Sequence, residues 1–147
     1  MTDKTKHAPT TAKYKPLPVK AVNAAVGKEV GCVEFMSSAS RGSGKEGISK
    51  SAKCREVALL TVDEIARGEK VDLLKLDVEG DEADAIEGAL ETIKRCYPSM
   101  AVSVYHRTHD IFALTQMLST LLPEHSLYLR REECIPAWDI TLFAVRN

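Results

Sequence analysis

Acidic side chains and a histidine stand where two predicted strands end. Asp77, Glu79 and Glu82 follow one apolar stretch, and His106 follows the next. A carboxylate beside a histidine can remove a proton from a hydroxyl group. Crowded carboxylates can also hold a divalent cation through their oxygen atoms. These residue types therefore indicate proton transfer or cation binding, although the spacing by itself assigns no residue as a metal ligand.

The acidic residues also have a purely structural explanation. Asp81 and Glu82 precede a helical pattern, and acidic residues in a first turn interact favourably with the positive end of a helix. This explanation is weaker for Asp77, because that residue ends an apolar strand and lies outside the helix. Both interpretations stay open for Asp81 and Glu82.

The apolar pattern of the chain predicts alternating strands and helices. Strands are expected at residues 19–26, 31–36, 71–77, 100–105, 126–130 and 140–145, and helices at 61–68, 82–95 and 111–121. An α/β sheet with right-handed crossovers follows, with the last two strands as an antiparallel pair at one edge. Ligands bind such sheets beyond the carboxyl ends of the parallel strands, which is where Asp77 and His106 stand.

Local signals predict the ends of the helices. Thr61 and Glu64 have the spacing of a capping box, and Gly68 suits the left-handed residue that ends a helix. The third helix is expected to be capped by Thr108 or Asp110. The strand 71–77 does not alternate cleanly, which predicts a central parallel strand that is covered on both faces.

Glycines within residues 37–51 reproduce a nucleotide-binding pattern by their spacing alone. Gly42, Gly44 and Gly47 fit GxGxxG, but that motif needs a strand before it and a helix at its last glycine. Residues 48–53 have no helical apolar stripe. We therefore expect a surface loop here and no nucleotide site.

Composition and charge exclude several classes of protein. A chain of 147 residues with 44% hydrophobic and 28% charged residues suits one folded domain. A net charge of -1 argues against a nucleic-acid partner, and no apolar run approaches the roughly 20 residues of a membrane span. The cysteines stand alone and form neither a metal-binding pair nor a disulfide framework, which favours a cytoplasmic location.

The first residues differ from the rest of the chain in charge. Residues 1–20 carry five lysines against one aspartate, a net charge of +4, which leaves -5 for the remainder. Three prolines and the lack of an apolar run predict a basic, flexible tail over residues 1–18. The folded domain is then expected over residues 19–147.

A motif surrounds the carboxyl end of the strand 71–77. It reads as an apolar run, then Lys-apolar-Asp, then apolar-Glu-Gly-x-Glu and a helix, and its fixed positions are Lys75, Asp77, Glu79, Gly80 and Glu82. In this form it resembles the signature of the FkbM family of S-adenosylmethionine-dependent methyltransferases. Residues 103–107, 127–130 and 138–141 resemble the family's later strands, and residues 23–27 resemble its segment near the cofactor adenine.

This resemblance implies a Rossmann-like methyltransferase sheet that is mainly parallel, with S-adenosylmethionine as the cofactor. It implies methyl transfer to a hydroxyl of a small-molecule or carbohydrate acceptor, such as a sugar or a natural product. The roles that it implies are a reaction site at Asp77, Glu79 and His106 with one of them as proton acceptor, cofactor contacts at Asn23, Ala24 and Asp77, and acceptor contacts at Glu82, Tyr105 and Arg107. Glu82 would contact either the acceptor or a cation.

The family's opening elements have no counterpart before Val19. Members carry a glycine-rich cofactor loop after their first strand and an acidic residue at the end of their second, and the polar stretch before Val19 matches neither. The chain thus resembles a partial methyltransferase domain that lacks the first two strands, which predicts an unpaired edge on the strand 71–77. Such an edge is prone to association, so we expect that the chain forms a homodimer, pairs differently, or is a fragment of a longer protein. The alternative function is a truncated, non-catalytic α/β module that acts through protein contacts.

Overall fold

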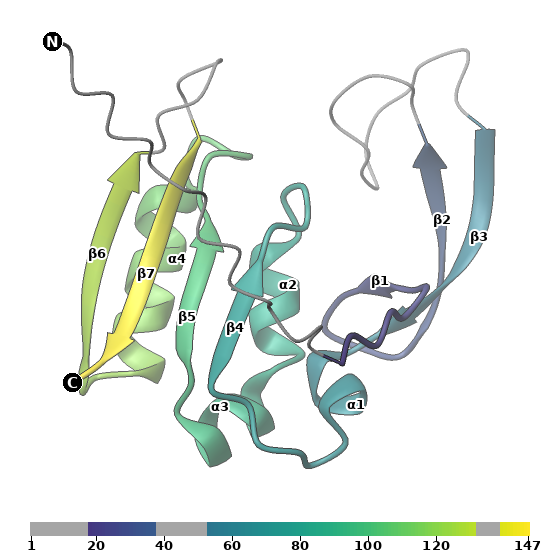
Figure 1. The fold of residues 1–147 in the computed structure, drawn as a ribbon. Helices are drawn as coiled ribbons and strands as arrows, with labels where there is room; N and C mark the ends of the chain where they lie inside the picture. Colours follow the sequence, from purple (N-terminus) through teal and green to yellow (C-terminus); the bar gives the residue numbers. More distant parts are fainter. Residues whose placement is uncertain (1–17, 38–52, 132–138) are drawn as a thin grey trace, which may run out of the picture.

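The computed structural model describes residues 18–37, 53–131 and 139–147, which form two sheets and four helices. The strands are β1 (Ala25–Val26), β2 (Gly31–Ser37), β3 (Lys53–Leu60), β4 (Leu73–Leu76), β5 (Ser99–Ser103), β6 (His125–Arg131) and β7 (Ile140–Arg146). The helices are α1 (Val62–Ala66), α2 (Glu82–Glu87), α3 (Leu90–Cys96) and α4 (Asp110–Leu121). One sheet has the strand order β4-β5-β7-β6 and the other β1-β3-β2 (Figure 1).

The four-stranded sheet is mixed. β4 and β5 are parallel, whereas β7 is antiparallel to both β5 and β6. Three strands thus run in one direction and β7 runs against them. The predicted antiparallel pair at the C-terminus is confirmed, with β6 at the outer edge of the sheet.

The core lies between this sheet and the helices α2, α3 and α4, which cover one of its faces (Figure 1). Strand residues two apart point to the same face of a sheet, so alternate positions of β5 and β7 are buried against the helices. These positions are Met100, Val102, Leu142 and Ala144. The helices contribute Ala85, Ile86, Ile93, Leu114 and Leu118. Among the described residues, no helix is both long and apolar enough to cross a membrane.

β4 lies at the edge of the sheet. In the described part of the chain it pairs with β5 alone, as the predicted unpaired edge requires. The prediction that this strand is covered on both faces is wrong, because Leu73 is 63% exposed and only Leu76 among its four residues is buried.

The helix predicted over residues 82–95 is interrupted, and α2 and α3 are separate helices. The interruption falls at Gly88, where a Cβ atom would lie 2.1 Å from the carbonyl oxygen of Gly27. The N–H of Asp63 donates to the carbonyl of Gly88 at 3.0 Å. The Asp63 carboxylate also accepts from the N–H groups of Glu91 at 3.1 Å and Thr92 at 2.7 Å, and so caps the start of α3. Contacts from distant residues therefore break the helix.

The three-stranded sheet agrees with the sequence only in part. β2 forms as predicted, but only the last two residues of the predicted strand 19–26 pair, and β3 was not predicted. None of the described side chains of these strands is buried. Most of the predicted loop 37–51 and nearly all of the predicted tail 1–18 lie outside the described residues.

Two helix starts show how local the capping signals are. The side-chain oxygen of Thr61 accepts the N–H of Glu64 at 3.0 Å, as predicted. The left-handed C-cap of α1 is Arg67, at φ +46°, and Gly68 directly after it is also left-handed, at φ +79°. At α4 the cap is His109, so the prediction of Thr108 or Asp110 is wrong. The Asp110 carboxylate instead accepts the N–H of Arg107 at 2.9 Å, which orders the turn before the helix.

Candidate active site

The candidate site lies at the carboxyl ends of β4 and β5, which are parallel. Ligands of α/β sheets bind beyond this end of the parallel strands. Asp77 directly follows β4, and His106 comes three residues after β5. The turn between β4 and α2 is tight, with Glu79 at φ +57° and Gly80 at φ +102°. This turn folds the start of α2 back towards the strand ends and brings Glu82 within reach of His106.

The left-handed turn explains two of the motif residues. At Gly80 a Cβ atom would meet the Nε atom of Arg107 at 3.2 Å, in addition to the positive φ, so glycine is required there. Glu79 is not glycine, and a left-handed conformation costs such a residue about 1–2 kcal/mol. Strain of this kind is concentrated at functional sites. The left-handed conformation of Glu79 places its carboxylate at the tip of the turn.

The buried carboxylate of Glu82 contacts one ring nitrogen of His106. The Glu82 side chain is 1% exposed, and its Oε1 accepts the N–H of Val78 at 3.0 Å. The same oxygen lies 2.9 Å from Nδ1 of His106. An ionised carboxylate can only accept, so opposite an ionised Glu82 the Nδ1 atom is the donor of this contact.

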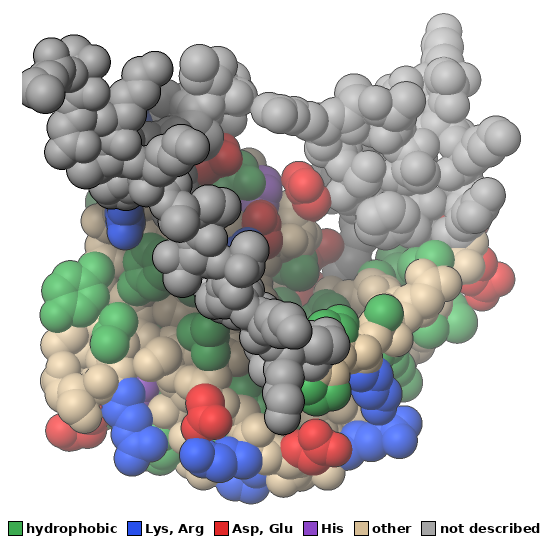
Figure 2. Space-filling model, viewed as in Figure 1, with side chains coloured by type: hydrophobic (Ala, Val, Ile, Leu, Met, Phe, Trp, Pro, Cys, Tyr) green, Lys and Arg blue, Asp and Glu red, His purple; other side chains and the backbone are tan. Residues whose placement is uncertain are grey.

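Nε2 of His106 faces two other carboxylates. It lies 3.7 Å from Oδ1 of Asp77 and 3.5 Å from Oε2 of Glu79. The His106 side chain is 10% exposed, whereas those of Asp77 and Glu79 are 42% and 45% exposed. A molecule that approaches this cluster therefore meets the two carboxylates first, with the imidazole behind them. Figure 2 shows acidic side chains and a histidine gathered towards the upper edge of the molecule.

Tyr105 forms one wall of the site. Its ring centroid lies 4.2 Å from that of His106. Burial raises the pKa of Tyr105 to about 12, and the negative charges of Asp77, Asp139 and Glu79 and a hydrogen bond to Asp77 act in the same direction. The phenol therefore stays protonated at neutral pH. A protonated phenol beside Asp77 is suited to donate a hydrogen bond and not to accept a proton.

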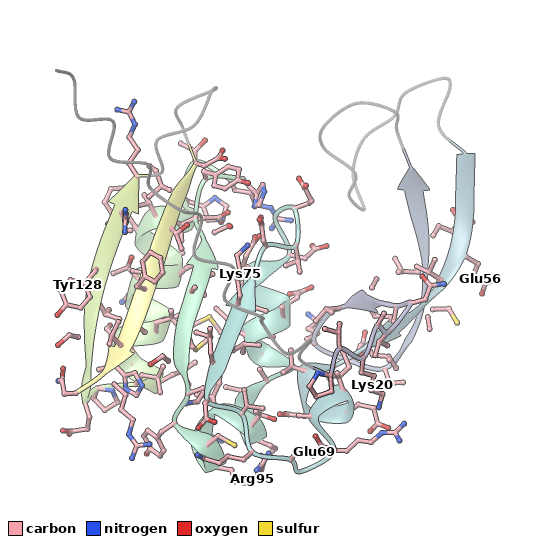
Figure 3. The ribbon with its side chains drawn as sticks, viewed as in Figure 1. Lys20, Glu56, Glu69, Lys75, Arg95 and Tyr128 are labelled. Carbon is pink, nitrogen blue, oxygen red and sulfur yellow. The ribbon has the colours of Figure 1, made fainter. Side chains whose placement is uncertain are left out.

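Basic side chains flank the acidic cluster. Nζ of Lys75 lies 3.9 Å from Oδ2 of Asp77, and the Lys75 side chain is well exposed (Figure 3). On the other side, Nη2 of Arg107 lies 3.6 Å from Oδ1 of Asp81. Exposed pairs at these distances contribute little to stability. Both cations lie beside the acidic cluster and are paired with carboxylates.

The structure brings together most of the residues that the sequence singles out. These are Asp77, Glu79, Glu82, Tyr105, His106 and Arg107. Glu82 contacts His106 and presents almost no surface to an acceptor. The sequence analysis did not single out Asp139, whose negative charge contributes to the raised pKa of Tyr105. The signal for it is its position directly before β7, since the start of β7 pairs with the end of β5.

Asn23 lies apart from this cluster. It lines a pocket of ≈ 370 Å³ whose other walls come from the segment before β1, the end of β3 and the region of α1. Those walls are Lys20, Ala21, Val22, Leu60, Glu64, Ile65 and Arg67. None of the cluster residues lines it, and Figure 3 places Lys20 beside α1, away from the turn that follows β4. Ala24 is half-buried next to Asn23.

The chain was compared with protein-family models, curated proteins and solved structures. A family model described as the methyltransferase FkbM domain matches residues 9–132, so the match begins inside the predicted tail. A crystal structure of methyltransferase FkbM from Methylobacillus flagellatus KT is similar to this chain, with a TM-score of 0.61 and 22% sequence identity. That likeness covers 82% of this chain and 27% of the other, and at this identity it shows a shared fold. A comparison with curated proteins found no match.

Proposed function

We propose that this chain, which belongs to the methyltransferase FkbM domain family, supplies the reaction site of an S-adenosylmethionine-dependent O-methyltransferase. The acceptor would be a small molecule or carbohydrate with a free hydroxyl, such as a sugar or a natural product. The observation that carries the proposal is the arrangement of His106, whose Nε2 faces the exposed carboxylates of Asp77 and Glu79 at the strand ends.

Two features of the chain suit the cofactor. The pocket beside Asn23 combines an amide with the apolar side chains of Val22 and Leu60, and its ≈ 370 Å³ is within the usual range for small-molecule sites. The family resemblance would put the adenine beside Asn23 and Ala24, but Asn23 lies apart from Asp77 and Glu79, so the proposal rests on the cluster and not on this pocket. The negative charges of Asp77 and Glu79 favour a cationic ligand group. When bound, S-adenosylmethionine supplies a methyl group on a positively charged sulfur, and the electron pair of the broken C–S bond stays on sulfur as the acceptor oxygen forms the new C–O bond.

Glu79 is the proton acceptor in this proposal. Its carboxylate makes no hydrogen bond among the described residues, and it stands at the exposed tip of the turn. Asp77, in contrast, has Nζ of Lys75 3.9 Å from its Oδ2 atom, and its charge contributes to the raised pKa of Tyr105. The proton of the acceptor hydroxyl therefore passes to Glu79 as the oxygen takes up the methyl group. Tyr105 and Arg107 would orient the acceptor.

A second candidate function rests on the open edge of β4. In the described residues this strand pairs on one side only, and Leu73 beside the open edge is 63% exposed. The chain also spans 27% of the length of the similar methyltransferase. Open strand edges pair readily with other strands. The second candidate is therefore a non-catalytic module that acts through protein contacts, such as a homodimer.

Calorimetric titration of the chain with S-adenosylmethionine tests the first proposal. We expect micromolar binding that is weakened at least about tenfold by Asp77→Asn, because the variant loses a charged partner for the cationic ligand. Asp72→Asn is the matched control, since Asp72 is an exposed aspartate next to the same strand and is paired with Lys70.

The absence of heat with a folded chain would overturn the enzymatic proposal. Light scattering then tests the second candidate, which predicts a dimer. A monomer in which β4 amides resist hydrogen exchange would contradict the pairing of this edge with a second copy.

A further inference from the structure

The pocket beside Asn23 lies where the three-stranded sheet meets α1, and no residue of the acidic cluster lines it. Its volume is ≈ 370 Å³, and small-molecule sites commonly measure about 300–1,000 Å³. Figure 3 shows Lys20, one of its lining residues, beside α1 and away from the turn that follows β4. The pocket thus has the size of a small-molecule site, and the proton transfer proposed above does not use it.

Two basic side chains, Lys20 and Arg67, line this pocket. Within the described ranges neither of them forms an ion pair, whereas Lys70 and Lys75 elsewhere in the chain each face an aspartate. Glu64 is the acidic side chain among the lining residues, which leaves the walls with one net positive charge. The pocket therefore attracts an anion, and the planar fork of an arginine matches the two oxygens of a carboxylate.

Apolar side chains supply much of the remaining wall. Val22 and Ile65 are 44% and 37% exposed, although both are large apolar residues, and Leu60 lies beside them in the same pocket. Covering apolar surface that is in contact with water is favourable. The amide of Asn23 adds both a donor and an acceptor. A ligand that suits these walls has an apolar body as well as a negative charge.

We propose that this pocket binds a small organic anion that carries one carboxylate on an apolar or aromatic body. The carboxylate would lie against Lys20 and Arg67, and the body would cover Val22 and Ile65. A phosphate ester carries a charge of about −1.5 to −2 at neutral pH, so the nearby carboxylate of Glu64 disfavours it more than a carboxylate with a single charge.

The charge of the walls also separates this site from that of the methyl donor. The sulfonium and ammonium groups of S-adenosylmethionine outweigh its carboxylate, so the molecule has one net positive charge. Such a ligand suits the carboxylates of Asp77 and Glu79 better than a pocket with two unpaired basic side chains. The proposed anion site is thus independent of the proposed methyl transfer.

A bound anion should stabilise the junction between the small sheet and α1. Leu60 at the end of β3 and Ile65 in α1 both line the pocket, and the carbonyl of Leu60 accepts the N–H of Gly27 at 3.0 Å. A ligand that binds only the intact pocket raises the free energy needed to open it. Hydrogen exchange at the N–H of Gly27 should therefore slow when the pocket is filled.

NMR titration of the full chain with 3-phenylpropionate tests the site. The matched neutral probe is 3-phenylpropan-1-ol, which has the same body without the charge. We expect the acid to bind at least about tenfold more tightly than the alcohol, because it gains charge-assisted hydrogen bonds. The amide resonances of Asn23, Ile65 and Arg67 should shift, while that of His106 stays unchanged.

Two variants assign the binding to the basic side chains. Lys20→Gln and Arg67→Gln each remove one charge from an exposed residue, and each should weaken binding of the acid about tenfold while leaving that of the alcohol unchanged. Lys94→Gln is the matched control, since Lys94 is an exposed lysine in the last turn of α3, outside the pocket. It should leave the binding of both probes unchanged.

Three results would overturn the proposal. Equal binding of the acid and the alcohol would mean that the pocket is an apolar surface without an anion site. Tighter binding of phenyl phosphate than of 3-phenylpropionate would contradict the preference for a single charge. Shifts at Asn23 and Arg67 on addition of S-adenosylmethionine would assign the pocket to the cofactor, whereas shifts confined to the acidic cluster would support two separate sites.

Discussion

The two sheets of this chain differ in what they bury. In the four-stranded sheet, β5 buries four of its five residues, and helices cover one face. In the three-stranded sheet, none of the described side chains of β1, β2 and β3 is buried. The acidic cluster stands on the packed sheet, at the ends of β4 and β5.

This difference matters for function because a reaction site needs fixed side chains. Close packing holds the end of β5, and with it His106, at a defined distance from the turn after β4. Regions with few buried apolar contacts open locally at low cost in free energy. We therefore expect the three-stranded sheet to open while the cluster stays intact.

The largest expected effect comes from a matched pair of leucine truncations. Leu118 is fully buried under the four-stranded sheet, and Leu118→Ala should lower the free energy of unfolding by about 2–5 kcal/mol. Leu60 at the end of β3 is only partly buried, and Leu60→Ala should cost less than half as much. Urea unfolding followed by circular dichroism measures both. Equal losses would show that the two sheets form a single packed unit.

A smaller effect is expected at the contact between the two regions. Gly88→Ala places a Cβ atom 2.1 Å from the carbonyl oxygen of Gly27 and should cost about 1–3 kcal/mol. Gly31→Ala is the control, because a Cβ atom there meets nothing within 4 Å. Hydrogen exchange at the N–H of Gly27, which donates to the carbonyl of Leu60, should accelerate only in Gly88→Ala. Unchanged exchange would mean that this contact does not hold the small sheet in place.

The same contrast explains what the sequence could predict of the fold. The cap of α1 at Thr61 depends on residues three apart and was predicted correctly. The break at Gly88 depends on the backbone of Gly27, far away in the sequence, and the glycine itself is its one local sign. β3 was missed because its first half is mostly polar and its apolar run, residues 57–60, lacks the alternation of a half-buried strand.

The site divides in a similar way. Asp77 and His106 could be predicted to meet because each follows a parallel strand of the same sheet. The contact between Glu82 and His106 depends on the left-handed turn at Glu79 and Gly80, which the residue types alone do not specify. The sequence therefore predicted which residues gather, and the backbone of the turn decides which of them is buried.

The smallest predicted effect concerns pH and the packed sheet alone. The pKa of Tyr105 is about 12 in the folded chain, against 10.0 as its ordinary value. The folded state thus binds this proton more tightly, and the resulting stability is present below pH 10 and is lost as pH rises through 12. Between these values the melting temperature should fall more steeply for the native chain than for Tyr105→Phe. If the melting temperatures of the two proteins fall equally with pH, then folding does not raise the pKa of Tyr105.

The central claim is that buried Glu82 fixes His106 with its proton on Nδ1 and its Nε2 facing Asp77 and Glu79. Nitrogen-15 NMR of the imidazole tests it most directly, because protonated and bare ring nitrogens of a neutral histidine resonate at different frequencies. For His106 we predict a proton on Nδ1 and a bare Nε2, while exposed His109 shows a mixture of both forms. A neutral His106 with its proton mainly on Nε2 would contradict the account.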